Sequence, residues 1–268
     1  MTLEEKLLSL KKEFVKSYDG SSHIQEIIPQ NSDDSFDIAK NDLDYLHMFA
    51  KNNPIYYNSF IQTIDGLPCV VYEGDINQYW LSSIQYGNSK APFSPTWIMS
   101  AHLLVRHAKN LGCTGVVDIG SGDGRIAFCA KSIDMKSHSI EIDEDLVDLQ
   151  KSICTKLIDF NPACADATKF DYSLLDIENP AFFIGGLAQM GGDVLADAVI
   201  KNIKSKDNTL MVLAGTVSPK YTDDTANAGW SKIIQKHNLQ VIKTVTLPTV
   251  WTFKELHDTP YLFCKFKN

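Results

Sequence analysis

The sequence lacks any closely spaced pair of cysteines. Its six cysteines are scattered singly, at positions 69, 113, 129, 154, 164 and 264. Zinc clusters and disulfide frameworks need cysteines at short, regular spacings, so neither is predicted and no metal site is expected. In a chain of 268 residues, scattered thiols are typical of a reducing compartment. We therefore expect a cytoplasmic protein that folds on its hydrophobic core alone.

Long apolar runs are also absent. No stretch approaches the roughly 18 to 20 consecutive apolar residues of a membrane-spanning helix. The first residues, MTLEEKLLSLKKEF, form a charged amphipathic segment without the apolar region of a secretory signal. The sequence therefore predicts no membrane partner and no export.

Positive charge is scarce. The chain has 25 basic residues against 33 acidic ones, a net charge of −8, and no obvious cluster of lysine and arginine. Nucleic-acid-binding proteins usually carry a basic stripe. The acidic balance disfavours a large nucleic acid as partner without excluding it, and it favours a basic protein substrate.

Residues 1–90 are predicted to form a mainly helical and irregular N-terminal region. Apolar residues recur near the helical period over 3–14, and a polar break follows. Ser35 or Asp37 is a candidate cap for a second helix. Residues 54–85 are expected to be irregular, except for a short strand through residues 69–72. The region has two open interpretations, a lid or substrate-recognition module and a stabilising cap.

Residues 91–268 alternate between strand and helix signals. The segments VVDIG, SHSIEI, AFFIGG and TLMVLAG are strand-like, and helices are predicted near 96–109, 125–132, 146–157 and 194–203. Such alternation predicts an α/β fold, a mostly parallel doubly wound sheet with helices on both faces. The last two apolar segments, LQVIKTVTL and PYLFCKF, have no helix between them and are predicted to form an antiparallel edge.

One segment, VVDIGSGDGR at residues 116–125, carries the chemical signal. An apolar strand runs into Gly120, Gly122 and Gly124, and a helix follows. Glycine permits a tight turn and close approach to a ligand, and N–H groups at a helix start bind carboxylate or phosphate oxygens. Glu141 ends the next strand, 21 positions after Gly120. That is close to the spacing of about 20 expected for a ribose-binding acid in a nucleoside-binding α/β unit.

The ligand that fits this segment has an amino-acid end and a ribose but no phosphates. Asp118 precedes the glycines on the strand, where its carboxylate would repel a pyrophosphate but can hold an amino group. S-adenosylmethionine meets these demands. After a further helix, Asp166 is placed to accept from the adenine amino group, and a backbone N–H beside it can meet a ring nitrogen. The ordinary alternatives are a tight turn, a solvated acid at Glu141 and a loop cap at Asp166.

The segment VVDIGSGDGR followed by IEIDED resembles the class I S-adenosylmethionine-dependent methyltransferases. The longer stretch APFSPTWIMSAHLLVRHAKNLGCTGVVDIGSGDGRIAFCA is similar to the start of the archaeal protein lysine methyltransferases, which are related to the non-SET histone lysine methyltransferases. The resemblance covers residues 91–268 and is strongest over 91–145. It implies a Rossmann-like, seven-stranded methyltransferase domain at 91–268, preceded by the additional region 1–90.

The resemblance also implies that the proline-rich lead folds over the cofactor, with Phe93, Ser94 and Thr96 near it. A plain linker before a helix is the alternative. The candidate cofactor-binding residues are then Phe93, Thr96, Asp118, Gly120, Ser121, Gly122, Gly124, Glu141, Ile142, Asp166 and Ala167.

The acceptor side of the site gives a weak signal, and no catalytic residue is predicted. The segment GGLAQMGG at 185–192 holds no acid, histidine or tyrosine to act as a base. Asn179 and Pro180 are interpreted as a turn before a strand; otherwise Asn179 would be a catalytic hydrogen-bond acceptor. The aromatic residues close in sequence form either a slot for a lysine side chain or simple core: Tyr79, Trp80, Tyr86, Phe93 and Trp97.

These observations predict an S-adenosylmethionine-dependent methyltransferase that transfers a methyl group to a protein lysine. Two alternatives remain open. The first keeps the cofactor and changes the acceptor to RNA, DNA or a small molecule. The second is a non-catalytic binding module of the same fold. The sequence does not indicate an oligomeric state.

Overall fold

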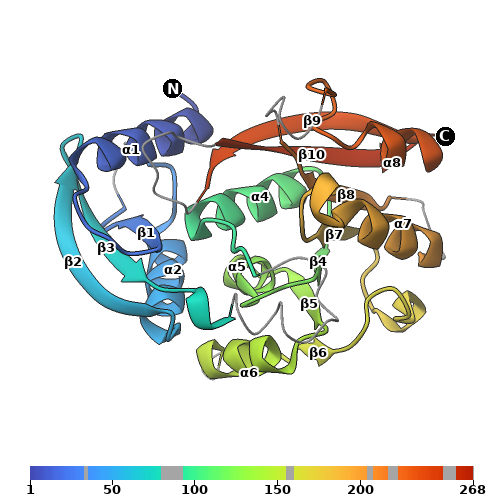
Figure 1. The fold of residues 1–268 in the computed structure, drawn as a ribbon, viewed down its shortest axis with the longest axis horizontal. Helices are drawn as coiled ribbons and strands as arrows, with labels where there is room; N and C mark the ends of the chain where they lie inside the picture. The colour runs from blue at the N-terminus through green and yellow to red at the C-terminus, as the bar shows by residue number, and fades with distance from the viewer. Residues whose placement is uncertain are drawn as a thin grey trace.

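The computed structural model describes residues 1–32, 36–79, 93–154, 160–203, 208–216, 223–249 and 258–267. This part of the chain forms two sheets, one of three strands and one of seven. Figure 1 shows the small sheet and its helices at the left, beside the large sheet and the helices that cover it.

The large sheet has the strand order β6-β5-β4-β7-β8-β10-β9. Strands β6, β5, β4, β7 and β8 run parallel to their neighbours, and β10 pairs antiparallel with both β8 and β9. The strands are β4 (Gly115–Ile119), β5 (Lys136–Glu141), β6 (Ala163–Cys164), β7 (Pro180–Ile184), β8 (Leu210–Ala214), β9 (Leu239–Pro248) and β10 (Asp258–Phe266). The order reverses between β4 and β7, and in such sheets ligands bind beyond the carboxyl ends of the strands at that point.

Both faces of the large sheet are buried because alternate residues of its strands lie in two different apolar clusters. In β4, Val116 belongs to one cluster, while Val117 and Ile119 belong to the other. Side chains alternate between the faces of a strand, so a sheet with this pattern needs helices on both sides. The helices are α4 (Ile98–Asn110), α5 (Arg125–Ser132), α6 (Glu144–Ile153), α7 (Gly192–Asn202) and α8 (Ser231–Lys236).

The predicted doubly wound, mostly parallel sheet with a terminal antiparallel pair is therefore confirmed, and its seven strands form a Rossmann-like sheet. Short 3₁₀ turns, η1 (Tyr172–Leu174) and η2 (Ala188–Met190), connect parts of the second half. Within the described ranges, no helix has both the length and the apolar character needed to cross a bilayer.

The N-terminal region contains more strand than the sequence predicted. Its helices are α1 (Leu3–Ser17) and α2 (Lys40–Asn52), and its strands are β1 (Ile24–Pro29), β2 (Tyr56–Ile64) and β3 (Leu67–Gly74). The strands form an antiparallel sheet in the order β1-β3-β2. Describing residues 1–90 as mainly helical is thus incomplete. The expectation of irregular structure was wrong over β2, whereas the short strand predicted at 69–72 is confirmed as part of β3. The sequence misses β1 because all six of its residues are buried, including Gln25 and Glu26, which leaves no alternating pattern.

The second helix also begins differently from the prediction. The residue that precedes α2 is Ala39, which makes no side-chain capping bond. Asp37 instead pairs with Arg106 of α4, at 3.2 Å between Oδ2 and Nη2. Ser35 lies outside the described residues.

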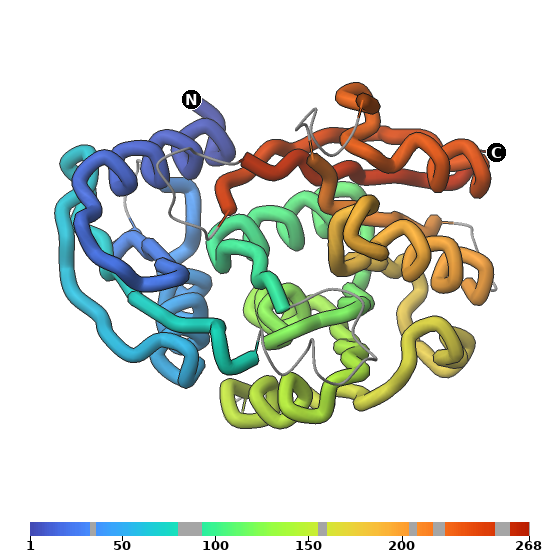
Figure 2. The backbone as a smooth tube through the Cα atoms, in the orientation of Figure 1, coloured from blue at the N-terminus to red at the C-terminus, as the bar shows by residue number. Residues whose placement is uncertain are grey.

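The N-terminal region packs directly on the domain that contains the large sheet. One apolar cluster contains Leu7 of α1, Ile27 of β1 and Leu46 of α2 together with Val116 of β4. Figure 2 shows the N-terminal part of the chain, in blue, lying beside α4 and α5, in green. The predicted boundary at residue 90 lies outside the described residues.

Candidate functional site

The loop from β4 to α5 is built on three glycines in the left-handed region. Gly120, Gly122 and Gly124 have φ values of 64°, 58° and 75°. Two of them also have no room for a side chain, because a Cβ on Gly122 would lie 2.6 Å from Cε2 of Phe93 and one on Gly124 would lie 2.8 Å from Oε1 of Gln150. The two-residue spacing of the glycines therefore fixes both the shape of the loop and its close packing.

A buried polar network supports the loop from behind. Nε2 of Gln150, on α6, donates to Oγ of Ser121 at 2.9 Å and to the carbonyl oxygen of Gly122 at 2.7 Å. The hydroxyl of Ser139, on β5, lies 2.7 Å from Oγ of Ser121 and 2.5 Å from Oε1 of Gln150. Ser121 was predicted from its place in the motif, but Gln150 and Ser139 were not, since a glutamine within an amphipathic helix and a serine within a strand give no local signal.

Glu141 ends β5 with its carboxylate turned toward the glycine loop. Oε2 accepts from the N–H of Gly122 at 2.8 Å, and Oε1 accepts from the N–H groups of Ile142 at 2.8 Å and Asp143 at 3.1 Å. The residue is 7% exposed, and burial raises the pKa of its carboxyl, although these backbone donors oppose the shift. A carboxylate has about four acceptor sites, so one remains for a hydroxyl donor.

Asp118 lies beneath the same loop, near the end of β4. Its Oδ2 accepts from the N–H of Ala127 in α5 at 3.2 Å, and the residue is 4% exposed. Burial raises the pKa of the Asp118 carboxyl well above its usual range, and the negative charges of Asp123 and Glu141 raise it further. A cationic ligand group near Asp118 would therefore be attracted by the negative charge of these neighbours and would favour the ionised form of Asp118.

Asp123 and Arg125, on either side of Gly124 at the end of the motif, form a bidentate ion pair. Nε of Arg125 lies 2.9 Å from Oδ1 of Asp123, and Nη2 lies 2.5 Å from Oδ2. Nη1 of Arg125 also donates to Oε1 of Glu26 in β1 at 2.6 Å. All three side chains are almost completely buried. No local pattern indicated that Glu26, 99 positions before Arg125, belongs to this site.

The proline-rich lead does reach the glycine loop. Phe93 is buried, and its ring packs closely on Gly122. The carbonyl oxygen of Thr96 accepts a hydrogen bond from Nη1 of Arg125. Ser94 is exposed. The structure thus places Phe93 and Thr96 beside the loop. Phe93 contacts Gly122 of the loop itself, whereas Thr96 contacts the buried side chain of Arg125.

The described aromatic residues near the lead, Tyr79, Phe93 and Trp97, do not share one slot. Trp97 is fully buried in the core, and the rings of Tyr79 and Phe93 pack edge to face at 6.2 Å between centroids. Trp80 and Tyr86 lie outside the described residues. For Trp97 and Phe93, simple core was the correct interpretation.

Asp166 and Ala167 follow β6, at the next strand along the sheet edge. Oδ1 of Asp166 accepts from the backbone N–H of Thr168 at 2.9 Å and from its hydroxyl at 2.6 Å, and Oδ2 lies 3.1 Å from Nζ of Lys169. The N–H of Ala165 donates to the carbonyl oxygen of Glu141 at 2.8 Å, which ties this turn to the end of β5. Asp166 therefore caps a local turn beside the candidate site, and Ile142, 37% exposed, lies on the same edge.

The carboxyl end of β7 closes against the loop by backbone contact. A Cβ on Gly185 would lie 2.8 Å from the carbonyl oxygen of Gly120. Asn179 lies at the opposite, amino end of β7, where its backbone pairs with Thr114. The prediction that Asn179 precedes the strand is therefore confirmed, whereas Pro180 is the first residue of β7 and not part of a turn. Asn179 does not face the candidate site.

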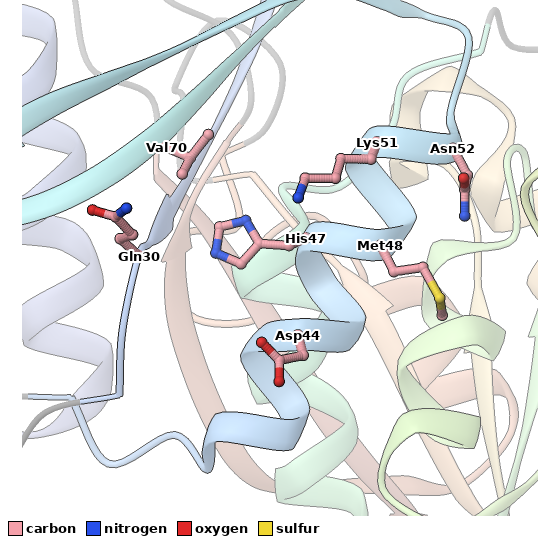
Figure 3. Close-up of a pocket in the computed structure, with 7 residues that line it drawn as sticks. All are labelled: Gln30, Asp44, His47, Met48, Lys51, Asn52 and Val70. Carbon is pink, nitrogen blue, oxygen red and sulfur yellow. The ribbon is translucent and has the colours of Figure 1, made fainter.

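A separate hollow of about 380 Å³ lies in the N-terminal region. Figure 3 shows His47 and Lys51 pointing from α2 toward Gln30 and Val70. The ring of His47 is held by the hydroxyl of Tyr72 at 2.9 Å and the carbonyl oxygen of Pro29 at 3.0 Å. No residue of the glycine loop lines this hollow, so it is distinct from the candidate site. Across the ranges that the structure describes, no group of three or more acidic, histidine or cysteine side chains is arranged to hold a metal ion.

No family model matches the chain, and no curated protein matches it in sequence. Solved structures are similar to parts of it. The magnesium protoporphyrin IX methyltransferase of Synechocystis PCC 6803, solved with bound S-adenosylmethionine, is 10% identical, covers 86% of this chain and 99% of its own, and has a TM-score of 0.48. TYW2 of P. horikoshii, in complex with MeSAdo, is 16% identical over 78% of this chain and 72% of its own, with a TM-score of 0.49.

A proposed RNA methyltransferase of Pyrococcus horikoshii is 12% identical over 64% of this chain and 83% of its own, also with a TM-score of 0.49. At these levels the likeness carries no argument about activity. The fold assignment rests on the strand order and the two buried faces described above.

Proposed function

We propose that this protein is an S-adenosylmethionine-dependent methyltransferase. The observation that carries the proposal is the pair of buried carboxyl groups, Asp118 and Glu141, which approach one glycine loop from adjacent parallel strands. Together with the position at which the strand order reverses, they mark the crevice where such folds bind their ligands.

The residues fit a ligand that carries a ribose and an amino group. The remaining acceptor site on Glu141 suits one ribose hydroxyl, and a second becomes available if the 3.1 Å bond from Asp143 opens. Asp118 would hold the amino group directly or through water, and the ligand's positive charge would favour its ionised form. A pyrophosphate would instead meet two buried acids with no basic side chain turned toward it among the residues described at this loop, which argues against a dinucleotide.

The remaining candidates have supporting roles. The backbone of Gly120, Ser121, Gly122 and Gly124 would approach the amino-acid end and the ribose. Phe93 would shield the loop from solvent, and Thr96 would act through Arg125. Ile142, Asp166 and Ala167 would contact the adenine. Asp166 is already engaged by Thr168 and Lys169, so its contact with the adenine amino group would need one of its oxygens to accept an additional bond.

The chemistry needs no dedicated base on this chain. S-adenosylmethionine supplies a methyl group on a sulfonium, and transfer is an in-line displacement in which positioning at about 3 to 3.5 Å provides much of the rate. Residues 185–192 offer no acid, histidine or tyrosine, so this chain would contribute by orienting the acceptor and excluding water. A lysine acceptor would lose its proton more readily in such a desolvated site.

For the acceptor we propose a protein lysine. Two features support this choice: the resemblance of residues 91–145 to the archaeal lysine methyltransferases, and the net charge of −8, which favours a basic protein. The second candidates, RNA, DNA or a small molecule, keep the same cofactor site and differ only at the acceptor side.

Calorimetry tests the cofactor, with S-adenosylmethionine and its demethylated product as ligands and NAD as the matched nucleotide control. We expect both sulfur ligands to bind and NAD not to bind. Absence of binding by both would refute the proposal. A radiolabelled methyl donor added to cell lysate, which is then separated into protein, nucleic acid and small-molecule fractions, tests the acceptor. Label in lysine of the protein fraction is expected, and label confined to another fraction would replace lysine with that acceptor class.

A further inference from the structure

A buried ionic cluster joins the N-terminal sheet to the glycine loop. It contains Glu26 from β1 and the motif residues Asp123 and Arg125. The side chains of Glu26, Asp123 and Arg125 are between 0% and 3% exposed. The guanidinium of Arg125 therefore bridges a carboxylate of the N-terminal region and a carboxylate of the loop.

Each carboxylate of the cluster also receives hydrogen bonds from the N-terminal region or the lead. Oε1 of Glu26 accepts from the hydroxyl of Tyr56 in β2 at 2.8 Å, and its Oε2 accepts from the N–H of Ile98 at the start of α4 at 2.9 Å. Oδ2 of Asp123 accepts from Nδ2 of Asn53, the residue that follows α2, at 3.0 Å. The cluster thus connects β1, β2 and α2 to the loop within one set of bonds.

The charges of the cluster depend on each other. Burial raises the pKa of the Glu26 carboxyl, and Arg125 opposes that shift. Burial disfavours the charge on Arg125, but Asp123 and Tyr56 hold the pKa of its guanidinium well above the usual range. Lys11 of α1 is a further buried cation whose pKa burial lowers to about 8, with Glu26 opposing the shift. Removing one charge from such a cluster leaves another uncompensated in the core, so its members hold one another in place.

We propose that the N-terminal region is a support for the cofactor loop, and that Glu26 and Tyr56 are positioning residues that act on it through Arg125. The inference rests on the proposed function and deepens it, because it assigns residues 1–79 to the cofactor side of the site instead of to acceptor recognition. Gly122 and Gly124 flank Asp123. The residue that the cluster holds therefore lies between the two loop glycines that pack closely on Phe93 and Gln150. By linkage, a ligand held by the loop would in turn stabilise the N-terminal sheet.

The test compares Glu26→Gln and Tyr56→Phe with Ile27→Val as the matched control. Ile27 neighbours Glu26 on β1, is equally buried and points to the opposite face of the strand, so its truncation perturbs the same sheet without touching the cluster. Hydrogen exchange is measured on the loop amides of residues 119–128 in the ligand-free protein, and calorimetry measures affinity for the demethylated cofactor product. Global unfolding by denaturant is measured for each variant, and exchange is read well below each melting temperature.

We expect Glu26→Gln to speed exchange of the loop amides and to weaken product binding, each by about tenfold. Tyr56→Phe should produce the same two effects at smaller size, since it removes one hydroxyl and no charge. Ile27→Val should leave both quantities within about twofold after correction for global stability. A purely structural role for Glu26 would change global stability alone and leave loop exchange equal to that of the control.

Equal loop exchange in Glu26→Gln and Ile27→Val overturns the inference. If Glu26→Gln does not fold, Tyr56→Phe decides by the same comparison. If the wild-type protein binds neither cofactor nor product, the proposed function fails, and loop exchange in the free protein still decides whether the N-terminal region supports the loop.

Discussion

Glu141 offers the sharpest test of the proposed contact with a ribose. We predict that Glu141→Ala weakens binding of the demethylated cofactor product by about 10- to 150-fold. The estimate follows from losing one charge-assisted hydrogen bond to a ribose hydroxyl, worth about 1.5–3 kcal/mol, with about 1.4 kcal/mol for each factor of ten. Calorimetry measures the change directly.

The same substitution has a separate effect on stability. It leaves the buried N–H of Gly122 without its acceptor at 2.8 Å, which costs about 1–3 kcal/mol. The N–H groups of Ile142 and Asp143 lie nearer the surface and can turn to water. Burial raises the pKa of Glu141, which means that its buried charge is itself unfavourable. Removing that charge therefore offsets part of the loss in the free energy of unfolding. We therefore expect a melting temperature lower by only a few degrees, and a larger effect on binding than on folding.

Ligand fragments separate ribose recognition from general disturbance. Methylthioadenosine keeps the ribose and lacks the amino-acid end, so Glu141→Ala should weaken it by the same factor as the complete product. Methionine lacks the ribose and should be unaffected. Asp143→Asn is the matched control, because Asp143 is the adjacent carboxylate and caps α6 through the N–H of Asp145 at 2.9 Å. Unchanged binding of methylthioadenosine by Glu141→Ala would refute the assignment of Glu141 to the ribose.

Three further predictions concern the loop and its supports. Cofactor affinity should rise with pH up to the range near 8, where an α-amino group loses its proton. Burial raises the pKa of Asp118 and a bound ammonium favours its carboxylate, so binding releases a proton. A flat profile in the wild-type protein, or a rise that persists in Asp118→Asn, would contradict this. Gly122→Ala should abolish measurable cofactor binding and lower the melting temperature by several degrees, because φ is 58° and the added Cβ would meet Phe93. Gly66→Ala is the control for backbone strain alone, because Gly66 lies in the β2–β3 turn with φ of 80° and no atom within 4 Å of the added Cβ. Gln150→Leu should lower the free energy of unfolding by denaturant by about 2–4 kcal/mol, because the carbonyl of Gly122 and the hydroxyl of Ser139 each lose a buried partner. Gln62→Leu, at a half-exposed position of β2, is the control. A smaller loss of stability in Gln150→Leu than in Gln62→Leu would show that the network is dispensable.

The periodic parts of the chain were predictable from local sequence. The alternation of strand and helix signals over 91–268 predicted the large sheet, and its apolar strands were recognisable because both faces are buried and each strand is followed by a helix or a turn. The glycine spacing predicted the loop, since glycine adopts positive φ at no steric cost and three such positions follow one another here. Asp118 and Glu141 were found because each ends or nearly ends a strand next to that loop.

The N-terminal sheet was not predictable in the same way. Strand β1 carries Gln25 and Glu26 at fully buried positions, and β2 is largely exposed, so neither shows the alternation by which a half-buried strand is recognised. Asp166 illustrates a different limit. Its place after β6 followed from the sequence, but its engagement by Thr168 and Lys169 depends on the local turn.

Local sequence therefore determined the elements whose reason for forming lies within a few residues: amphipathic helices, buried parallel strands and a glycine turn. Tertiary structure alone decided which distant side chains share the site. Glu26 reaches Arg125 across 99 positions, and Gln150 reaches Ser121 across 29. A buried charge or amide must find partners wherever the fold brings them, and no spacing along the chain encodes that choice. The support of the glycine loop was thus hidden in the sequence, while the loop itself was not.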